Sequence, residues 1–154
     1  MIKPERFSCR VYGVLRRGNQ VLLTRSLFIR REFVNFPGGG IELGESPAAA
    51  LRREFREETG LAIKPLRLLF ASEEAHLSTQ KPIQIVSVYW LVRRAGGRLR
   101  ASGNGADVVS LFWADIARIP TGEMFPSDRE FARRLPELLR PEAKMLSSIR
   151  EETI

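Results

Sequence analysis

Three glutamates stand close together in the sequence, at a spacing that suits chemistry on phosphates. Glu54, Glu57 and Glu58 occupy positions i, i+3 and i+4, so on a helix their carboxylates project from one face. Such carboxylates repel one another unless a divalent cation lies between them. Their oxygens suit Mg²⁺ or Mn²⁺, which commonly also bind substrate phosphates. Taken alone, this spacing favours a solvated acidic helix face over a metal site, so the surrounding residues must decide.

The residues around these glutamates carry clear signals for a helix and for a preceding loop. Ser46-Pro47 is typical of an N-cap followed by the first helical residue, and Gly60 is typical of a helix end, which predicts a helix over residues 47–59. Before it, Pro37-Gly38-Gly39-Gly40 predicts a loop whose backbone adopts conformations that other residues resist. The glutamates would therefore lie on a short helix held beside a glycine-rich loop.

The spacing of these residues resembles the Nudix box of the Nudix hydrolases. Gly39 is followed after five residues by Glu45, and after seven more by the run Arg53-Glu54-Phe55-Arg56-Glu57-Glu58-Thr59-Gly60-Leu61. The preceding Phe36-Pro37-Gly38 also resembles the family. This match spans positions 39–61 and reverses the preference for a solvated face.

The resemblance implies a set of roles for the matching residues. Glu54, Glu57 and Glu58 would hold the catalytic divalent cations, with the carbonyl of Gly38 as a further ligand. Glu45 would orient Arg53 or reach an additional metal, and Arg53 would fix the loop on the helix. Glu54 is our first choice for the general base and Glu57 the second. The cofactor would be Mg²⁺, with Mn²⁺ as a substitute.

Residues outside the box are candidates for substrate binding. Fork-shaped guanidinium groups suit phosphates, and loops near the box helix often line the pockets of this family. The candidates are Arg25, Arg30, Arg31, Glu73, Glu74 and Asp107, with Glu123 as an alternative to Asp107 for an acid outside the box. His76 is more simply a loop or edge residue, and Trp90 and Trp113 are more simply core residues than nucleobase-stacking ones.

The order of elements predicts an α+β domain with an α/β/α sandwich and a mixed central sheet, as the resemblance also implies. We expect a hairpin from residues 7–15 and 20–24, and strands near 33–36, 62–74, 83–93 and 108–113, with a further short strand between Gly96-Gly97 and the loop 102–105. Ser127-Asp128-Arg129-Glu130 matches a capping box at the start of a second helix. Pro136 should kink or end that helix unless the chain rearranges locally.

Length and composition bound the remaining possibilities. The 154 residues suit a single domain over 1–154, with 141–154 as a loosely ordered tail. The sequence shows neither a membrane-spanning run nor a secretory signal, so we expect a cytoplasmic protein without a membrane partner. The lone Cys9 lies in an alternating apolar run and is expected in the core. A homodimer is possible.

The net charge is +7, although positions 39–61 carry five acids against three arginines, or −2, which leaves +9 on the rest of the chain. A basic chain attracts polyanions such as nucleotides or RNA. The resemblance implies a pyrophosphohydrolase acting on a nucleoside diphosphate linked to another moiety, such as an NTP or dNTP, ADP-ribose or a nucleotide sugar. Two alternatives remain open here: an RNA 5′-end pyrophosphohydrolase and a non-catalytic nucleotide or RNA sensor on the same fold.

Overall fold

A mixed eight-stranded sheet forms the centre of the computed structural model, which describes residues 3–78 and 81–140. The strands are β1 (Arg6–Arg17), β2 (Gln20–Phe28), β3 (Arg31–Asn35), β4 (Gly38–Gly40), β5 (Leu61–Ala71), β6 (His76–Leu77), β7 (Ile83–Gly97) and β8 (Val108–Asp115). The helices are α1 (Pro47–Thr59) and α2 (Pro126–Leu138), with two short 3₁₀ helices at Ile116–Arg118 and Thr121–Glu123.

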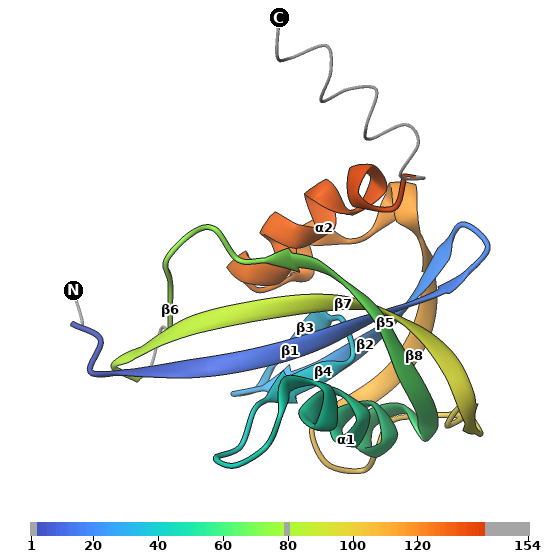
Figure 1. Cartoon of the computed structure of the whole chain (residues 1–154), viewed down its shortest axis with the longest axis horizontal. Helices are drawn as coiled ribbons and strands as arrows, with labels where there is room; N and C mark the ends of the chain where they lie inside the picture. The colour runs from blue at the N-terminus through green and yellow to red at the C-terminus, as the bar shows by residue number, and fades with distance from the viewer. Residues whose placement is uncertain (1–2, 79–80, 141–154) are drawn as a thin grey trace, which may run out of the picture.

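The sheet runs in the order β3-β2-β1-β7-β5, with β4 paired to β1, β6 to β7 and β8 to β2. Only the central β1 and β7 pair in parallel, and the other named pairs are antiparallel. Helices α1 and α2 lie on opposite sides of the sheet (Figure 1). The predicted α+β sandwich with a mixed sheet is therefore confirmed.

Two apolar clusters hold the helices onto the sheet. On the α1 side, Leu51 and Phe55 are fully buried together with residues of β1, β2, β5 and β7. On the α2 side, Phe131 stacks on Tyr89 of β7 with ring centroids 4.0 Å apart. Because both faces of the central strands are covered, β1 reads as a continuous buried run over residues 11–15 rather than as a simple alternation.

The prediction for the first helix is confirmed to the residue. Helix α1 covers Pro47–Thr59, and the Ser46 side chain accepts a hydrogen bond from the Ala49 amide. Gly60 ends the helix with φ of 79°, a conformation that favours glycine. Local signals fixed both ends because each involves residues within one turn of the helix.

The second helix differs from its prediction at both ends. It starts at Pro126 with Phe125 as the N-cap, and no side chain caps it, so the predicted capping box at Ser127 is wrong. Ser127 and Asp128 instead turn inward and are buried. Pro136 lies inside the helix, which continues to Leu138 although the proline nitrogen has no hydrogen to donate to the preceding turn.

Other differences concern the strands and the cysteine. Gly96 and Gly97 belong to β7, because β5 keeps pairing with β7 as far as Gly97, and residues 98–107 form neither helix nor strand, so the additional short strand is wrong. Strand β5 ends at Ala71, three residues before its predicted end. Cys9 is exposed rather than buried. The expected tail, 141–154, lies outside the described residues.

Candidate active site

The box helix is fixed on the sheet by two residues that neighbour its glutamates in the sequence. Phe55 is fully buried, and Gly13 of β1 leaves room for it, since a Cβ on Gly13 would lie 2.5 Å from the Phe55 ring. Thr59 also turns inward, and its hydroxyl donates to the Phe55 carbonyl at 2.5 Å. This packing determines which side of α1 the three box glutamates occupy.

Strand β4 brings backbone against two of those glutamates. Gly38, Gly39 and Gly40 pair with Tyr12, Val11 and Arg10 of β1. The Gly38 amide donates to Oε2 of Glu58 at 2.9 Å. A Cβ on Gly39 would lie 2.5 Å from Cδ of Glu54, so the carboxylate of Glu54 occupies the space that a side chain would fill. The glycines therefore let α1 approach the strand closely.

Arg53 ties the loop before the helix to the helix itself. Its Nε and Nη2 bind the two oxygens of Glu45 at 2.8 and 2.9 Å, which is a bidentate arrangement. Nη2 also donates to the Gly40 carbonyl at 3.0 Å, and Nη1 donates to Glu54 at 2.8 Å. Glu57 is more loosely bound, 3.5 Å from Nη1. One guanidinium therefore contacts the loop, β4 and two box glutamates.

These contacts shift the acidity of the site in opposite directions. The hydrogen bond from Arg53 lowers the pKa of Glu45 to about 2. Burial raises the pKa of Glu54, although Arg53 opposes the shift. Burial also raises the pKa of Glu58 to about 8; the Gly38 amide opposes this change, while the charges of Glu54 and Asp107 add to it. A strong desolvation cost on two neighbouring carboxylates is what a bound cation would relieve.

The donor set has the chemistry of a Mg²⁺ site, because it consists of carboxylate and carbonyl oxygens. Within residues 3–78 and 81–140, however, no three acidic, histidine or cysteine side chains are gathered closely enough to hold an ion as they stand. Glu58 faces the Gly38 amide, and the Glu57 side chain is 57% exposed. The residues fit the metal by type and position, but Glu57 and Glu58 would have to turn toward it.

The structure places the other predicted residues at several distinct locations. Arg25 forms an ion pair with Glu123 at 2.5 Å, so Glu123 is already paired and is not a free acid for the site. Arg30 lies at the β2–β3 turn with φ of 61°, and Arg31 covers the ring of Phe33 at 5.3 Å. Asp107 is exposed and close enough to Glu58 to raise its pKa. Of the acids considered outside the box, Asp107 alone among the described residues has this electrostatic link to Glu58.

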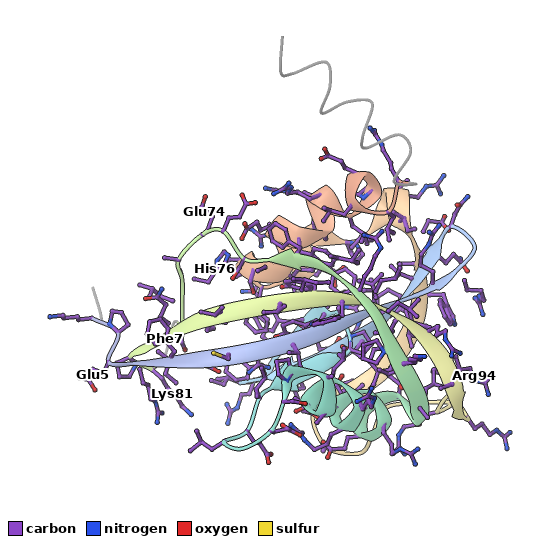
Figure 2. All side chains as sticks on the ribbon, viewed as in Figure 1. Glu5, Phe7, Glu74, His76, Lys81 and Arg94 are labelled. Carbon is purple, nitrogen blue, oxygen red and sulfur yellow. The ribbon has the colours of Figure 1, made fainter. Side chains whose placement is uncertain are left out.

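Glu73 and Glu74 lie on the segment between β5 and β6, away from the box. Glu73 accepts from Arg134 of α2 at 2.7 Å. His76 lies 2.7 Å from Glu130 of the same helix and pairs with β7, as expected of an edge residue. Figure 2 shows Glu74 on the outer side of this segment. The contacts of Glu73 and His76 attach the segment to α2 and give no link to the box glutamates.

The sequence analysis missed a buried polar group on the α2 side of β1. Asp128, which is 1% exposed, accepts from the Tyr89 hydroxyl at 2.6 Å. Tyr12 stacks on Tyr89, and Arg10 donates to the Tyr12 hydroxyl at 2.7 Å. The charge of Arg10 partly opposes the rise in the pKa values of Glu54 and Glu58, which links this group to the box. Only the capping-box pattern singled out Asp128, and it assigned the wrong role.

Asp128 makes the stability of the fold depend on pH. Burial raises its pKa from 3.8 to about 7, so the folded chain holds this proton more tightly than the unfolded chain does. Its contribution is therefore fully present below pH 4 and is lost as the pH rises through 7. Relative to Asp128→Asn, we expect the free energy of unfolding of the natural chain to fall by up to about 4 kcal/mol between pH 4 and pH 8.

Urea unfolding of both chains across this pH range measures the difference. Asp115→Asn is the matched control, because Asp115 is exposed, and its difference from the natural chain should stay nearly constant. A constant difference for Asp128→Asn as well would show that Asp128 is ionised throughout in the folded chain.

Comparison with known proteins gives a family match over most of the chain. The model of the family described as the NUDIX domain matches residues 5–135. The MutT protein from Methanosarcina mazei Go1 has a similar structure, with a TM-score of 0.72, 20% sequence identity, and coverage of 92% of this chain and 99% of that one. At this level of identity, the structural similarity supports the fold alone.

Two curated relatives are similar over about half of the chain. The RNA pyrophosphohydrolase of Xanthomonas oryzae pv. oryzae (strain MAFF 311018) is 42% identical over 73 residues, which cover 47% of this chain and 35% of the relative. The protein YjhB of Bacillus subtilis (strain 168), provisionally named an ADP-ribose pyrophosphatase, is 39% identical over 72 residues, covering 47% and 33%. The chain thus matches about a third of the length of each relative.

Proposed function

We propose, since this chain belongs to the NUDIX domain family, that it is a divalent-metal-dependent pyrophosphohydrolase. Its substrate would be a nucleoside diphosphate linked to a further group, and water would attack one phosphorus of the pyrophosphate bridge. The observation that carries the proposal is the position of the Glu54 carboxylate, which lies against Gly39 and is held by Arg53 at 2.8 Å.

The residues of the box divide the work between them. Arg53 and Glu45 hold the loop so that Gly38 and Gly39 keep their places beside α1. Glu54, Glu57 and Glu58, with the Gly38 carbonyl, would bind Mg²⁺, or Mn²⁺ in its place. The metal would neutralise the charge on the phosphate oxygens and lower the pKa of the attacking water. The raised pKa of Glu54 supports its assignment as the group that takes the proton of that water.

A carboxylate outside the box would complete the acidic side of the site. Asp107 is the best candidate because its charge acts on Glu58, whereas Glu123 is occupied by Arg25. Arg30 and Arg31 at the β2–β3 turn are exposed and have no ion pair in the described part of the chain, which leaves them available for substrate phosphates. Glu73 and Glu74 are weaker candidates, since Glu73 is bound to α2.

A second candidate function has specific support. The Xanthomonas relative is named an RNA pyrophosphohydrolase, and the net charge of +7 favours a polyanionic substrate. A 5′-triphosphate RNA carries the same pyrophosphate linkage as a nucleoside triphosphate, so the proposed chemistry would be unchanged. No helix within residues 3–78 and 81–140 is long and apolar enough to span a membrane. We also propose a cytoplasmic location.

A substrate screen tests this proposal. Release of phosphate or pyrophosphate would be measured with Mg²⁺ or Mn²⁺ over NTPs, dNTPs, ADP-ribose, nucleotide sugars, dinucleoside polyphosphates and 5′-triphosphate RNA. Metal-dependent turnover of one group would support the proposal and name the substrate. Absence of turnover over the whole panel, with Mn²⁺ binding still measurable, would favour the sensor alternative instead.

A further inference from the structure

The end of the sheet beyond α1 carries seven basic residues that the proposed reaction does not use. This basic end consists of Arg16 and Arg17 of β1, Lys64 of β5, Arg93 and Arg94 of β7, and Arg98 and Arg100 in the segment that follows. All seven are exposed. Figure 2 shows Arg94 projecting at the opposite end of the sheet from Phe7.

Strand pairing brings these charges together. Lys64 pairs with Arg93 across β5 and β7, and the parallel ladder of β1 and β7 ends at Leu15 and Val92, one residue before Arg16 and Arg93. Within residues 3–78 and 81–140, no carboxylate lies within ion-pair distance of the seven basic residues. Such a concentration of unpaired charge costs self-repulsion, which a bound polyanion would relieve.

Some of this charge has a structural explanation, and most of it does not. The Arg100 amide donates to the Thr59 carbonyl at 2.9 Å, so Arg98 and Arg100 lie at the C-terminus of α1, where cations stabilise a helix. This accounts for two of the seven residues. The other five residues lie on strands and not at a helix terminus, so helix stabilisation does not explain them.

The basic end is hollowed rather than flat. A cavity of about 320 Å³ is lined by Arg16, Arg17 and Arg94 together with the indole of Trp113. Arg17 lies over that indole at 4.2 Å. A second cavity, of about 620 Å³, is also lined by Arg16, with Arg118, Arg140 and one carboxylate, Asp115. Guanidinium groups around an aromatic ring in a concave surface suit phosphates and bases of a flexible strand.

We propose that the basic end binds the backbone of a single-stranded nucleic acid. This inference goes beyond the proposed hydrolase activity, because binding there requires no pyrophosphate bond. A flat anionic bilayer would meet the same charges but would not enter the two cavities, so the shape of the surface favours a strand. The smaller cavity adjoins the end of α1, since Leu61 and Leu99 line it, and Arg16 lines both cavities.

The test is fluorescence anisotropy with a labelled 20-nucleotide RNA that carries a 5′-hydroxyl and so offers no bond to hydrolyse. We expect Arg16→Glu/Arg94→Glu to weaken binding about tenfold or more and to reduce the slope of log affinity against log salt by about 1.4, which is 0.7 for each lost contact. The control Arg6→Glu/Arg133→Glu has the same net charge, with both changes at exposed positions elsewhere. The RNA affinity of this control should stay within about threefold of that of the natural chain, apart from the long-range charge effect that both variants share.

Two further arms separate the outcomes. Hydrolysis of the best small nucleotide is measured on every sample, so an inactive natural chain contradicts the proposed function without touching this inference. Equal loss of RNA binding in the basic-end and control variants overturns the inference, because net charge alone then explains binding. Retained RNA binding with loss of binding to phosphatidylglycerol vesicles overturns it in favour of a lipid surface. Arg16→Ala/Arg94→Ala, expected to give a smaller loss of the same kind, guards against a folding defect.

Discussion

Glu57→Gln is expected to lower metal-dependent hydrolysis about 100-fold or more while leaving thermal unfolding almost unchanged. Glutamine keeps the size of the side chain but removes the negative charge that would bind a cation. Glu57 is 57% exposed, and the contact with Arg53 at 3.5 Å is long. Little folding energy therefore depends on it, since exposed ion pairs contribute little. The loss would lie in catalysis rather than in the fold.

The measurement combines turnover with direct metal binding. Initial rates on the best substrate are compared with Mn²⁺ affinity from electron paramagnetic resonance, and both should fall together if Glu57 is a ligand. Glu137→Gln is the matched control, because Glu137 is also an exposed helical glutamate, on α2. Turnover at the natural rate in Glu57→Gln would remove Glu57 from the catalytic machinery. Normal Mn²⁺ affinity with lost turnover would instead make it a general base.

The sequence predicted those features that depend on near neighbours. Ser46 and Gly60 set the ends of α1, and each acts within one turn of the helix. Contact with Arg53 was one of the two roles that the family resemblance implied for Glu45, and the structure places these side chains 2.8 Å apart. Both ends of α1 were therefore predicted correctly, whereas the local pattern at Ser127 predicted the wrong start for α2.

Contacts between distant positions could not be predicted in this way. Asp128 is buried because Tyr89, 39 residues earlier, donates a hydrogen bond to it. Arg25 meets Glu123 across 98 residues. The local sequence does not distinguish such a buried carboxylate from the polar residues of a capping box. In both cases a short acidic side chain precedes an apolar helical stripe. The prediction that Cys9 is buried was wrong for a related reason. The alternation of apolar residues did not reveal that this side of β1 is left uncovered.

Gly39→Ala should abolish most of the turnover, whereas Gly40→Ala, one residue away on the same strand, should leave it nearly intact. A Cβ on Gly39 would lie 2.5 Å from Cδ of Glu54 and 2.6 Å from Oε1, whereas a Cβ on Gly40 would meet no atom within 4 Å. Both residues pair with β1, so the two changes share the cost of substituting a glycine in a strand.

The atoms that a Gly39 Cβ would meet belong to a flexible side chain, so the fold can yield by moving the Glu54 carboxylate. We therefore expect about 1 kcal/mol of lost stability but a roughly 100-fold fall in kcat/KM, because a carboxylate displaced by about 1 Å no longer meets the reacting water or its metal. Turnover and urea unfolding are measured on both alanine variants. Equal activity in the two would contradict the role of the Glu54 position, and an equal fall in both would assign the effect to the backbone of β4. Only a loss of turnover in Gly39→Ala that is absent in Gly40→Ala would show that catalysis depends on the position of the Glu54 carboxylate next to Gly39.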